Sequence, residues 1–194
     1  PAVQFYYTDV GVAEHGERLN MLFLRCPGDF SSVECLPPQL PPLNAVDDDG
    51  RYYEKKVDEW GTVWECRIFG RMGHAIDFPI KNESDYSKYS FPPVPAYVSD
   101  TSAFEKECIK VEQEKLHHVS MRGEGYSFLE RLIALRGFED AMCDLYDNGH
   151  LLNAFLDRLT DYYMQTIEKL IELKVDAINF GDDYGTQNSL LLSP

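Results

Sequence analysis

The chain has 194 residues, 44% of them hydrophobic and 13% aromatic, which is enough to build a core and argues against wholesale disorder. Its formal net charge of -15 argues against nucleic acid and against an anionic membrane surface as partners, because phosphate binding needs clustered lysine and arginine. No run of apolar residues is long enough to cross a bilayer.

The five cysteines are scattered along the chain and include no C-x-x-C pair. This pattern favours a reducing, cytoplasmic environment over a disulfide scaffold, and it predicts small buried residues rather than a zinc site. The neighbours His117 and His118 fall on a predicted strand, where adjacent side chains face opposite sides and do not easily share one ion. We therefore expect no metal ligands in this segment.

The first part of the chain predicts two short strands with a helix between them. Residues 2–7 are apolar and β-rich and run into a loop at 8–11 that contains Asp9. Residues 17–24 carry a weak helical pattern, and residues 29–36 predict a second strand with Glu34 near its end. Prolines at 37, 38, 41 and 42 then predict a long loop.

The middle of the chain predicts an excursion from this pattern. Residues 51–80 alternate apolar and polar side chains around three glycines, which is typical of an antiparallel hairpin. Residues 82–95 are polar and proline-rich and predict a surface connection. Residues 102–116 predict a charged helix, with Ser102 as N-cap and Glu105 completing a capping box.

The last part of the chain predicts two more strands and the clearest helices. Residues 118–121 predict a third short strand, and residues 128–146 predict helix with a break near Gly137. A single apolar stripe at helical spacing predicts a long helix after that, and residues 175–180 predict a fourth strand. The stripe consists of Leu152, Phe155, Leu156, Leu159, Tyr163, Ile167, Leu170 and Ile171.

Strands and helices in alternation, with nearly uniform apolar strands, predict an α/β fold with a parallel sheet covered by helices. Four strands with their helices make about half of a TIM-type (β/α)8 barrel, which needs ~250 residues. Residues 1–194 would then be the N-terminal part of one barrel domain, and we expect further strands from the rest of the polypeptide or from a second chain. A complete, smaller doubly wound sheet is the competing fold, although no glycine-rich phosphate fingerprint follows any strand.

In such folds ligands collect at the carboxyl ends of the strands, which identifies the candidate site residues. Asp182 and Asp183 follow the fourth strand and are predicted to be catalytic, with helix capping or their own turn as the alternative role. The candidate substrate-binding residues lie at the same kind of position after the four strands. They are Asp9, Glu34, Arg122, Glu124, Tyr184 and Gln187, and the alternatives for them are solvated loop or packing positions.

Three stretches in register resemble the uroporphyrinogen decarboxylase (URO-D) superfamily, which includes cobalamin-dependent methyltransferases. They are Asp-Glu-Trp-Gly-Thr-Val-Trp at 58–64, Phe-Leu-Glu-Arg through Leu-Arg-Gly at 128–137, and Val-Asp through Asp-Asp-Tyr-Gly-Thr-Gln to Ser-Pro at 175–194. The resemblance implies an eight-stranded β/α barrel with strands one to four in this chain and the hairpin as an insertion after strand two. It also implies a small-molecule substrate at the barrel mouth, and a homodimer in many members.

Two departures from the family pattern separate this chain from true decarboxylases. The arginine-rich segment that follows their first strand is replaced at 8–13 by Thr-Asp-Val-Gly-Val-Ala, and their Phe-Ser-Asp segment is replaced by Glu34-Cys35-Leu36. An acidic loop would repel a polycarboxylate tetrapyrrole. The resemblance therefore favours the methyltransferase branch, which moves a methyl group between a small molecule and a thiol or a corrinoid.

In that branch the corrinoid is carried by a separate protein, and a zinc ion activates the thiol. The resemblance implies that the His and Cys zinc ligands lie in the C-terminal half of the barrel, outside this segment. A decarboxylase with another substrate and a non-catalytic small-molecule binding barrel remain the alternatives. Because several carboxylates in one mouth repel one another, we expect a raised pKa among them and a cationic ligand such as a methylated amine.

Overall fold

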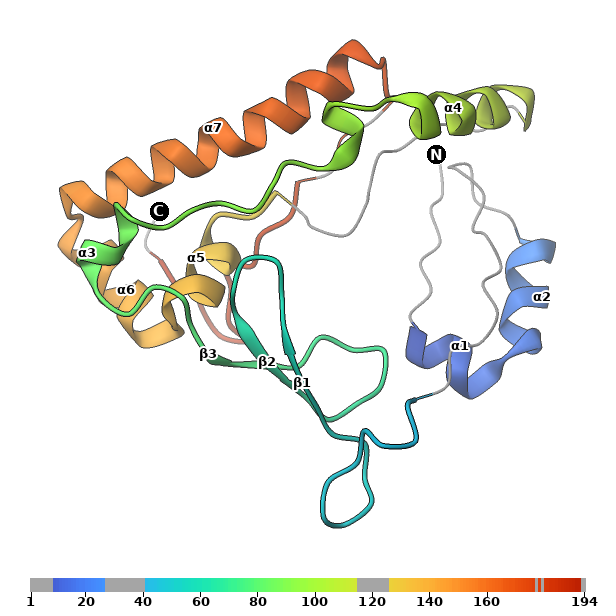
Figure 1. Ribbon diagram of the computed structural model, residues 1–194, viewed down its shortest axis with the longest axis horizontal. Coiled ribbons are helices and arrows are strands. Elements are labelled where there is room, and N and C mark those ends of the chain that lie inside the picture. Colours follow the sequence, from blue (N-terminus) through green and yellow to red (C-terminus); the bar gives the residue numbers. More distant parts are fainter. Residues whose placement is uncertain (1–8, 27–40, 115–125, 177, 179, 193–194) are drawn as a thin grey trace.

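The computed structural model describes residues 9–26, 41–114 and 126–192, except 177 and 179 (Figure 1). The chain begins there with two short helices, α1 (Asp9–His15) and α2 (Glu17–Arg25), which lie apart from the other described elements in Figure 1. The predicted helix at 17–24 is confirmed. The predicted loop at 8–11 is wrong from residue 9 onward, because the backbone is already helical at Asp9.

A three-stranded antiparallel sheet occupies the middle of the chain. Its strands are β1 (Glu54–Val57), β2 (Val63–Cys66) and β3 (His74–Asp77), in the order β1-β2-β3. Lys56 pairs with Trp64 across the first ladder, and the second ladder carries an irregularity between Val63 and Trp64. The antiparallel excursion predicted for residues 51–80 is confirmed.

The turn between β1 and β2 explains the Asp-Glu-Trp-Gly-Thr-Val-Trp stretch in structural terms. The Asp58 carboxylate accepts hydrogen bonds from the backbone N–H groups of Trp60 (3.0 Å) and Thr62 (2.8 Å) and from the Trp64 indole (2.8 Å). Gly61 has a φ of 84°, a conformation that other residues rarely adopt. The Thr62 hydroxyl then donates to the carbonyl of Ala134 (2.7 Å), which ties the sheet to the helical layer.

The helical layer consists of α5 (Leu129–Arg136), α6 (Phe138–Asp147) and α7 (His150–Glu172). The predicted break near Gly137 is confirmed, since this residue has a φ of 90° between α5 and α6. A Cβ at that position would lie 3.1 Å from the ring of Phe78, the residue after β3, so a larger side chain would also displace that ring. The backbone therefore turns sharply where the two helices meet.

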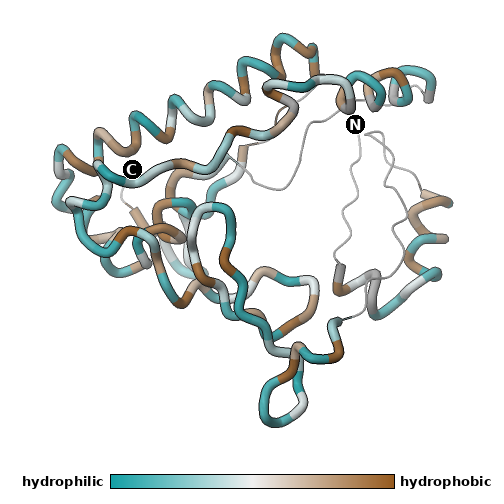
Figure 2. Tube along the Cα trace, in the orientation of Figure 1, coloured by the Kyte–Doolittle hydropathy of each residue, from teal (hydrophilic) through white to brown (hydrophobic). Residues whose placement is uncertain are grey.

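The long helix α7 supplies one wall of the core, as its apolar stripe predicts. Leu152, Phe155, Leu159, Tyr163 and Leu170 are buried, and hydrophobic and hydrophilic residues alternate along the helix in Figure 2. The prediction that the whole stripe is buried is wrong for its last residue, because the Ile171 side chain is 62% exposed.

The segment between the sheet and α4 (Ser102–Glu114) contains α3 (Glu83–Tyr86) and a 3₁₀ turn, η1 (Ala96–Val98). The surface connection predicted at 82–95 is confirmed for most of its polar residues, which are exposed, but it is wrong for its aromatic ones, because Tyr86 is fully buried and Phe91 stacks on Phe155 and Tyr162. Proline and polar residues predicted exposure, but the aromatic side chains between them complete the core. Its buried members are Trp60, Ile80, Tyr86, Leu132, Leu135, Ala141, Leu152, Phe155, Leu159, Tyr162 and Tyr163.

A buried polar network joins α3, α5 and α6 inside this core. The Asp144 carboxylate accepts hydrogen bonds from the Tyr86 hydroxyl (2.7 Å) and from Arg136 Nε (2.8 Å). Arg136 also donates to Asp140 (2.7 Å) and to the carbonyl of Lys81 (2.8 Å). Burial and the hydrogen bond to Asp144 raise the pKa of Tyr86. Burial alone would lower the pKa of Arg136, but the hydrogen bond to Asp144 and the charges of Asp144 and Asp140 together raise it, so both groups keep their protons.

The residue before α4 is Thr101, so the predicted N-cap at Ser102 is off by one residue. Thr101, rather than Ser102, pairs its hydroxyl with the Glu105 carboxylate (2.6 Å), and Asp100 accepts a hydrogen bond from the backbone of Ser102 (3.0 Å). The helix start itself was located correctly, since α4 begins at Ser102.

Three of the four predicted parallel strands, at 2–7, 29–36 and 118–121, lie outside the described residues. The fourth, at 175–180, is represented by one parallel bridge between Tyr126 and Phe180 rather than by an assigned strand. The described part of the chain thus contains helices and one antiparallel sheet. The β/α barrel stays a prediction.

Candidate functional site

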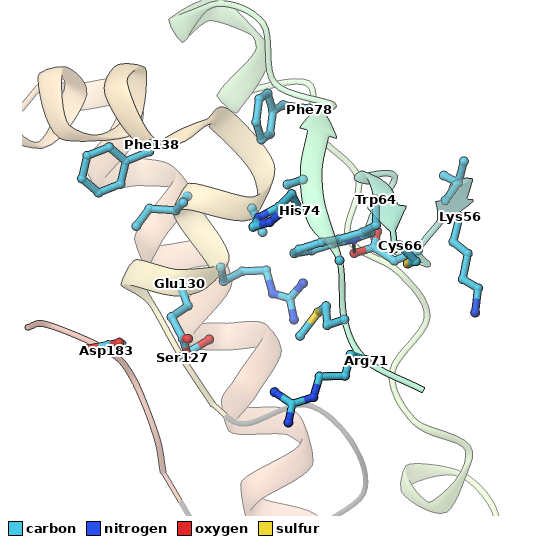
Figure 3. Close-up of a pocket in the computed structure, with 18 of the residues that line it drawn as sticks. Lys56, Trp64, Cys66, Arg71, His74, Phe78, Ser127, Glu130, Phe138 and Asp183 are labelled. Carbon is cyan, nitrogen blue, oxygen red and sulfur yellow. Dashed lines mark hydrogen bonds between the residues drawn. The ribbon is translucent and has the colours of Figure 1, made fainter. Parts of the chain in front are cut away.

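An open cleft of about 1000 Å³ lies between the antiparallel sheet and α5. Figure 3 shows Lys56, Arg71 and His74 on the side of the sheet, with Glu130 and Asp183 on the side of α5 and the C-terminal segment. This volume is at the upper end of the range for small-molecule sites. The cleft is therefore the candidate site among the described residues.

Asp182 fixes the C-terminal segment against the start of α5. One carboxylate oxygen accepts the backbone N–H groups of Phe128 (2.8 Å) and Leu129 (2.7 Å), and the other accepts that of Glu130 (2.9 Å). These N–H groups have no partner within the helix, and a carboxylate is favoured at this positive end of the helix dipole. Partial burial opposes ionisation, but the three backbone donors and Tyr184 outweigh it and lower the pKa of Asp182.

Of the two roles predicted for Asp182, its geometry is that of a cap, although the capped helix is α5, which begins more than 50 residues before Asp182, and not the helix that would follow it. Both oxygens are engaged by backbone groups, which leaves little room for a reacting group. Tyr184 contributes to this arrangement, since burial and its bond to Asp182 raise the pKa of the Tyr184 hydroxyl. Asp182 and Tyr184 thus position the chain at the edge of the cleft.

Asp183 and Glu130 supply the acidic side of the cleft. Asp183 is exposed and lines the cleft, and one of its oxygens accepts a hydrogen bond from the backbone of Gly185 (3.1 Å). Burial and the nearby charges of Asp182 and Asp183 raise the pKa of Glu130. The predicted cluster of Asp182 or Asp183 with Asp9 or Glu34 stays a prediction, and the raised pKa belongs to Glu130, which was not among its members.

The opposite side of the cleft carries basic side chains from the sheet. Arg71 lies in the loop between β2 and β3, His74 begins β3, and Lys56 extends from β1. The ammonium group of Lys56 is paired with Glu54 (3.1 Å). The cleft therefore carries acidic and basic groups, with Arg71 and His74 on the side of the sheet and with Glu130, Asp183 and Arg131 on the side of α5 and the C-terminal segment.

Apolar and aromatic groups line the space between these charges. Trp64, Met72, Phe78 and Phe138 all line the cleft, and Met72 and Phe138 are 80% and 49% exposed. Aromatic faces attract cations, and methionine adapts to irregular ligand surfaces. The lining fits an organic ligand with charged groups better than a bare ion.

Among the other predicted site residues, Gln187 is not brought to the cleft. It lies in a turn closed by Thr186 and Ser189. Asp9 begins α1, and its side chain lies outside what the structure describes. Glu34, Arg122 and Glu124 fall outside the residues that the structure describes.

Sequence reasoning missed Glu130, Arg71 and His74. Glu130 was part of the stretch at 128–137, and its place in the first turn of a helix was the available signal. Arg71 and His74 gave no such signal, because a loop arginine and a strand histidine are common on surfaces. Only the packing of the sheet against α5 brings them to a shared cleft.

Within the described ranges, no three His, Cys, Asp or Glu side chains are grouped so that they could hold a metal ion. The helices described here include none of the length and apolar character needed to cross a membrane.

Comparison with protein-family models, with characterised proteins and with solved structures finds no match to this chain.

Proposed function

We propose that this chain forms the first half of a URO-D-type barrel enzyme of the corrinoid-linked methyltransferase branch, acting on a small methylated cation. The observation that carries the proposal is the placement of Glu130 and Asp183 on one cleft together with aromatic side chains. Two carboxylates there favour a cation, and the rings accept its methyl groups through cation–π contact.

The three stretches that resemble the superfamily also support the proposal through their positions in space. The turn at 58–64, the start of α5 and the segment after Phe180 all meet around this cleft. The parallel bridge from Tyr126 to Phe180 places Asp182 and Asp183 just beyond the carboxyl end of a strand-like segment. Ligands of β/α barrels bind at such ends.

Zinc and a corrinoid on a partner protein are implied by the resemblance. The described residues supply no metal-binding group, so we assign to them the binding and orientation of the methylated cation and no step through either cofactor. In this assignment Asp182 positions the C-terminal segment, and Glu130 and Asp183 contact the ligand.

A calorimetric titration with tetramethylammonium tests this function. We expect binding to the wild-type protein and at least a fivefold loss of affinity in Glu130→Gln and Asp183→Asn, because each substitution removes one negative charge from the cleft. Affinity should also rise with pH through the raised pKa of Glu130, since the ionised carboxylate attracts the cation.

Glu168→Gln is the matched control, because this exposed glutamate lies on α7 and does not line the cleft. Equal affinities in all four proteins would remove Glu130 and Asp183 from the site. Methyl transfer to a free corrinoid, assayed on the wild type, separates the enzyme from a non-catalytic binding barrel.

A decarboxylase-like function is the second candidate, and the basic side of the cleft is the observation that favours it. Arg71 and His74 could hold the carboxylate of an anionic substrate. Titration with succinate distinguishes the two functions: tighter binding of succinate than of tetramethylammonium would favour the decarboxylase.

A further inference from the structure

We propose that the cleft binds a zwitterion, a quaternary ammonium compound that also carries a carboxylate, with its cationic end at Glu130 and Asp183 and its anionic end at Arg71. This inference rests on the proposed function and names the substrate class of the same site. It follows from the charges that remain unmatched on the two sides of the cleft.

Arg71 differs from two basic residues of the sheet, Lys56 and Arg67, in having no carboxylate partner among the described residues. Lys56 pairs with Glu54 at 3.1 Å and Arg67 pairs with Glu65 at 3.1 Å, so both charges are already balanced. In the part of the chain that the structure describes, no carboxylate lies within ion-pair distance of the exposed Arg71 guanidinium. Arg71 can therefore form a two-pronged hydrogen-bonded pair with a ligand carboxylate.

Glu130 is the counterpart on the opposite side. Its backbone N–H bonds to Asp182, while its side chain lines the cleft and carries no ion pair within the described residues. The charges of Asp182 and Asp183 act on Glu130 and disfavour a further anion there, and the neighbouring Arg131 opposes them only in part, since the pKa of Glu130 is still raised. A cationic ligand group would relieve this repulsion.

Figure 3 shows Arg71 and Glu130 approaching the same opening from the sheet and from α5. A simple cation would satisfy Glu130 and Asp183 but would leave Arg71 facing a like charge, and a simple anion would do the reverse. Opposite charges at the two ends of one molecule satisfy both sides at once. Trp64 and Met72, which also line the cleft, can contact the methylated portion.

The test compares four probes by calorimetry: tetramethylammonium, acetate, trimethylglycine and 4-(trimethylammonio)butanoate. We expect at least one of the two zwitterions to bind the wild-type protein about tenfold more tightly than tetramethylammonium. Which spacer binds best reports the separation of the two charged sides. Acetate alone should bind most weakly, because Glu130 and Asp183 repel it.

Arg71→Met should abolish the preference for the zwitterion while leaving tetramethylammonium binding intact or stronger. Arg67→Met is the matched control, since Arg67 lies at the end of the same sheet but is paired with Glu65 and does not line the cleft. A thermal melt of each variant verifies folding, and Arg71→Lys should retain part of the preference.

The outcomes separate this inference from the function on which it rests. Equal wild-type affinity for tetramethylammonium and both zwitterions, or a preference that survives in Arg71→Met, would overturn the zwitterion and leave the methylated-cation site in place. Absence of binding by every ammonium probe would overturn the proposed function itself.

Discussion

The helical core and the antiparallel sheet are stabilised in different ways. Around α7, aromatic rings stack in the interior, and a buried carboxylate and guanidinium satisfy each other. Within the three strands of the sheet, Cys66 alone is buried, and most other side chains are charged or partly exposed. The sheet depends on its anchors, namely the Asp58 turn, the buried Trp60 and the bond from Thr62 to Ala134.

This difference shows how the molecule separates stability from binding. Burial is concentrated where aromatic and aliphatic side chains pack closely, so substitutions there are expected to lower the free energy of unfolding. Several side chains that line the cleft, among them Arg71, Met72 and Glu130, are exposed and contribute little to the core. Substitutions there should change affinity and leave the fold intact.

The largest expected effect is in the buried network of the core. Asp144→Ala removes the partner of Arg136 Nε and of the Tyr86 hydroxyl and leaves a buried guanidinium poorly compensated. We expect the free energy of unfolding to fall by about 3–5 kcal/mol, measured by urea denaturation. Asp147→Ala, at an exposed position on the same helix, should change it by less than about 0.5 kcal/mol. A loss below about 1 kcal/mol in Asp144→Ala would mean that Asp140 alone compensates Arg136.

An intermediate effect is expected at the junction between core and cleft. Asp182→Ala leaves three backbone N–H groups at the start of α5 without their carboxylate, which should cost about 1–2 kcal/mol. Because the folded-state pKa of Asp182 is lowered, this contribution is present above the ordinary aspartate pKa and is lost as pH falls through the folded pKa.

Asp183→Ala is the matched control for that junction. Asp183 is exposed and bonds one backbone N–H of its own turn, so its loss should alter stability little and ligand affinity more. Similar destabilisation by the two substitutions at neutral pH, or identical pH profiles for wild type and Asp182→Ala, would contradict the capping role.

The smallest effect is expected in the cleft itself. The folded-state pKa of Glu130 is raised, so its ionisation opposes folding, and its contribution to stability declines as pH rises from the ordinary glutamate pKa through the raised one. Glu130→Gln should remove this decline and change the free energy of unfolding at neutral pH by no more than about 0.5 kcal/mol. Paired urea titrations at pH 4 and pH 7 measure it; a loss of more than about 1 kcal/mol would make Glu130 a structural residue.

The sequence by itself determined the features that depend on local periodicity and backbone chemistry. The stripe in α7 repeats at the helical period, and Gly137 adopts a positive φ that few residues tolerate, so both could be located without a structure. The antiparallel excursion at 51–80 was predictable from alternation and glycine turns in the same way.

Only the tertiary structure decided which distant residues meet. Asp182 caps a helix that begins more than 50 positions earlier, and Tyr86 reaches Asp144 across 58 positions. Arg71 and Glu130 share a cleft because the sheet packs on α5. No local pattern encodes such pairs, since a carboxylate or a guanidinium looks the same in sequence whether its partner is water, a helix end or a ligand.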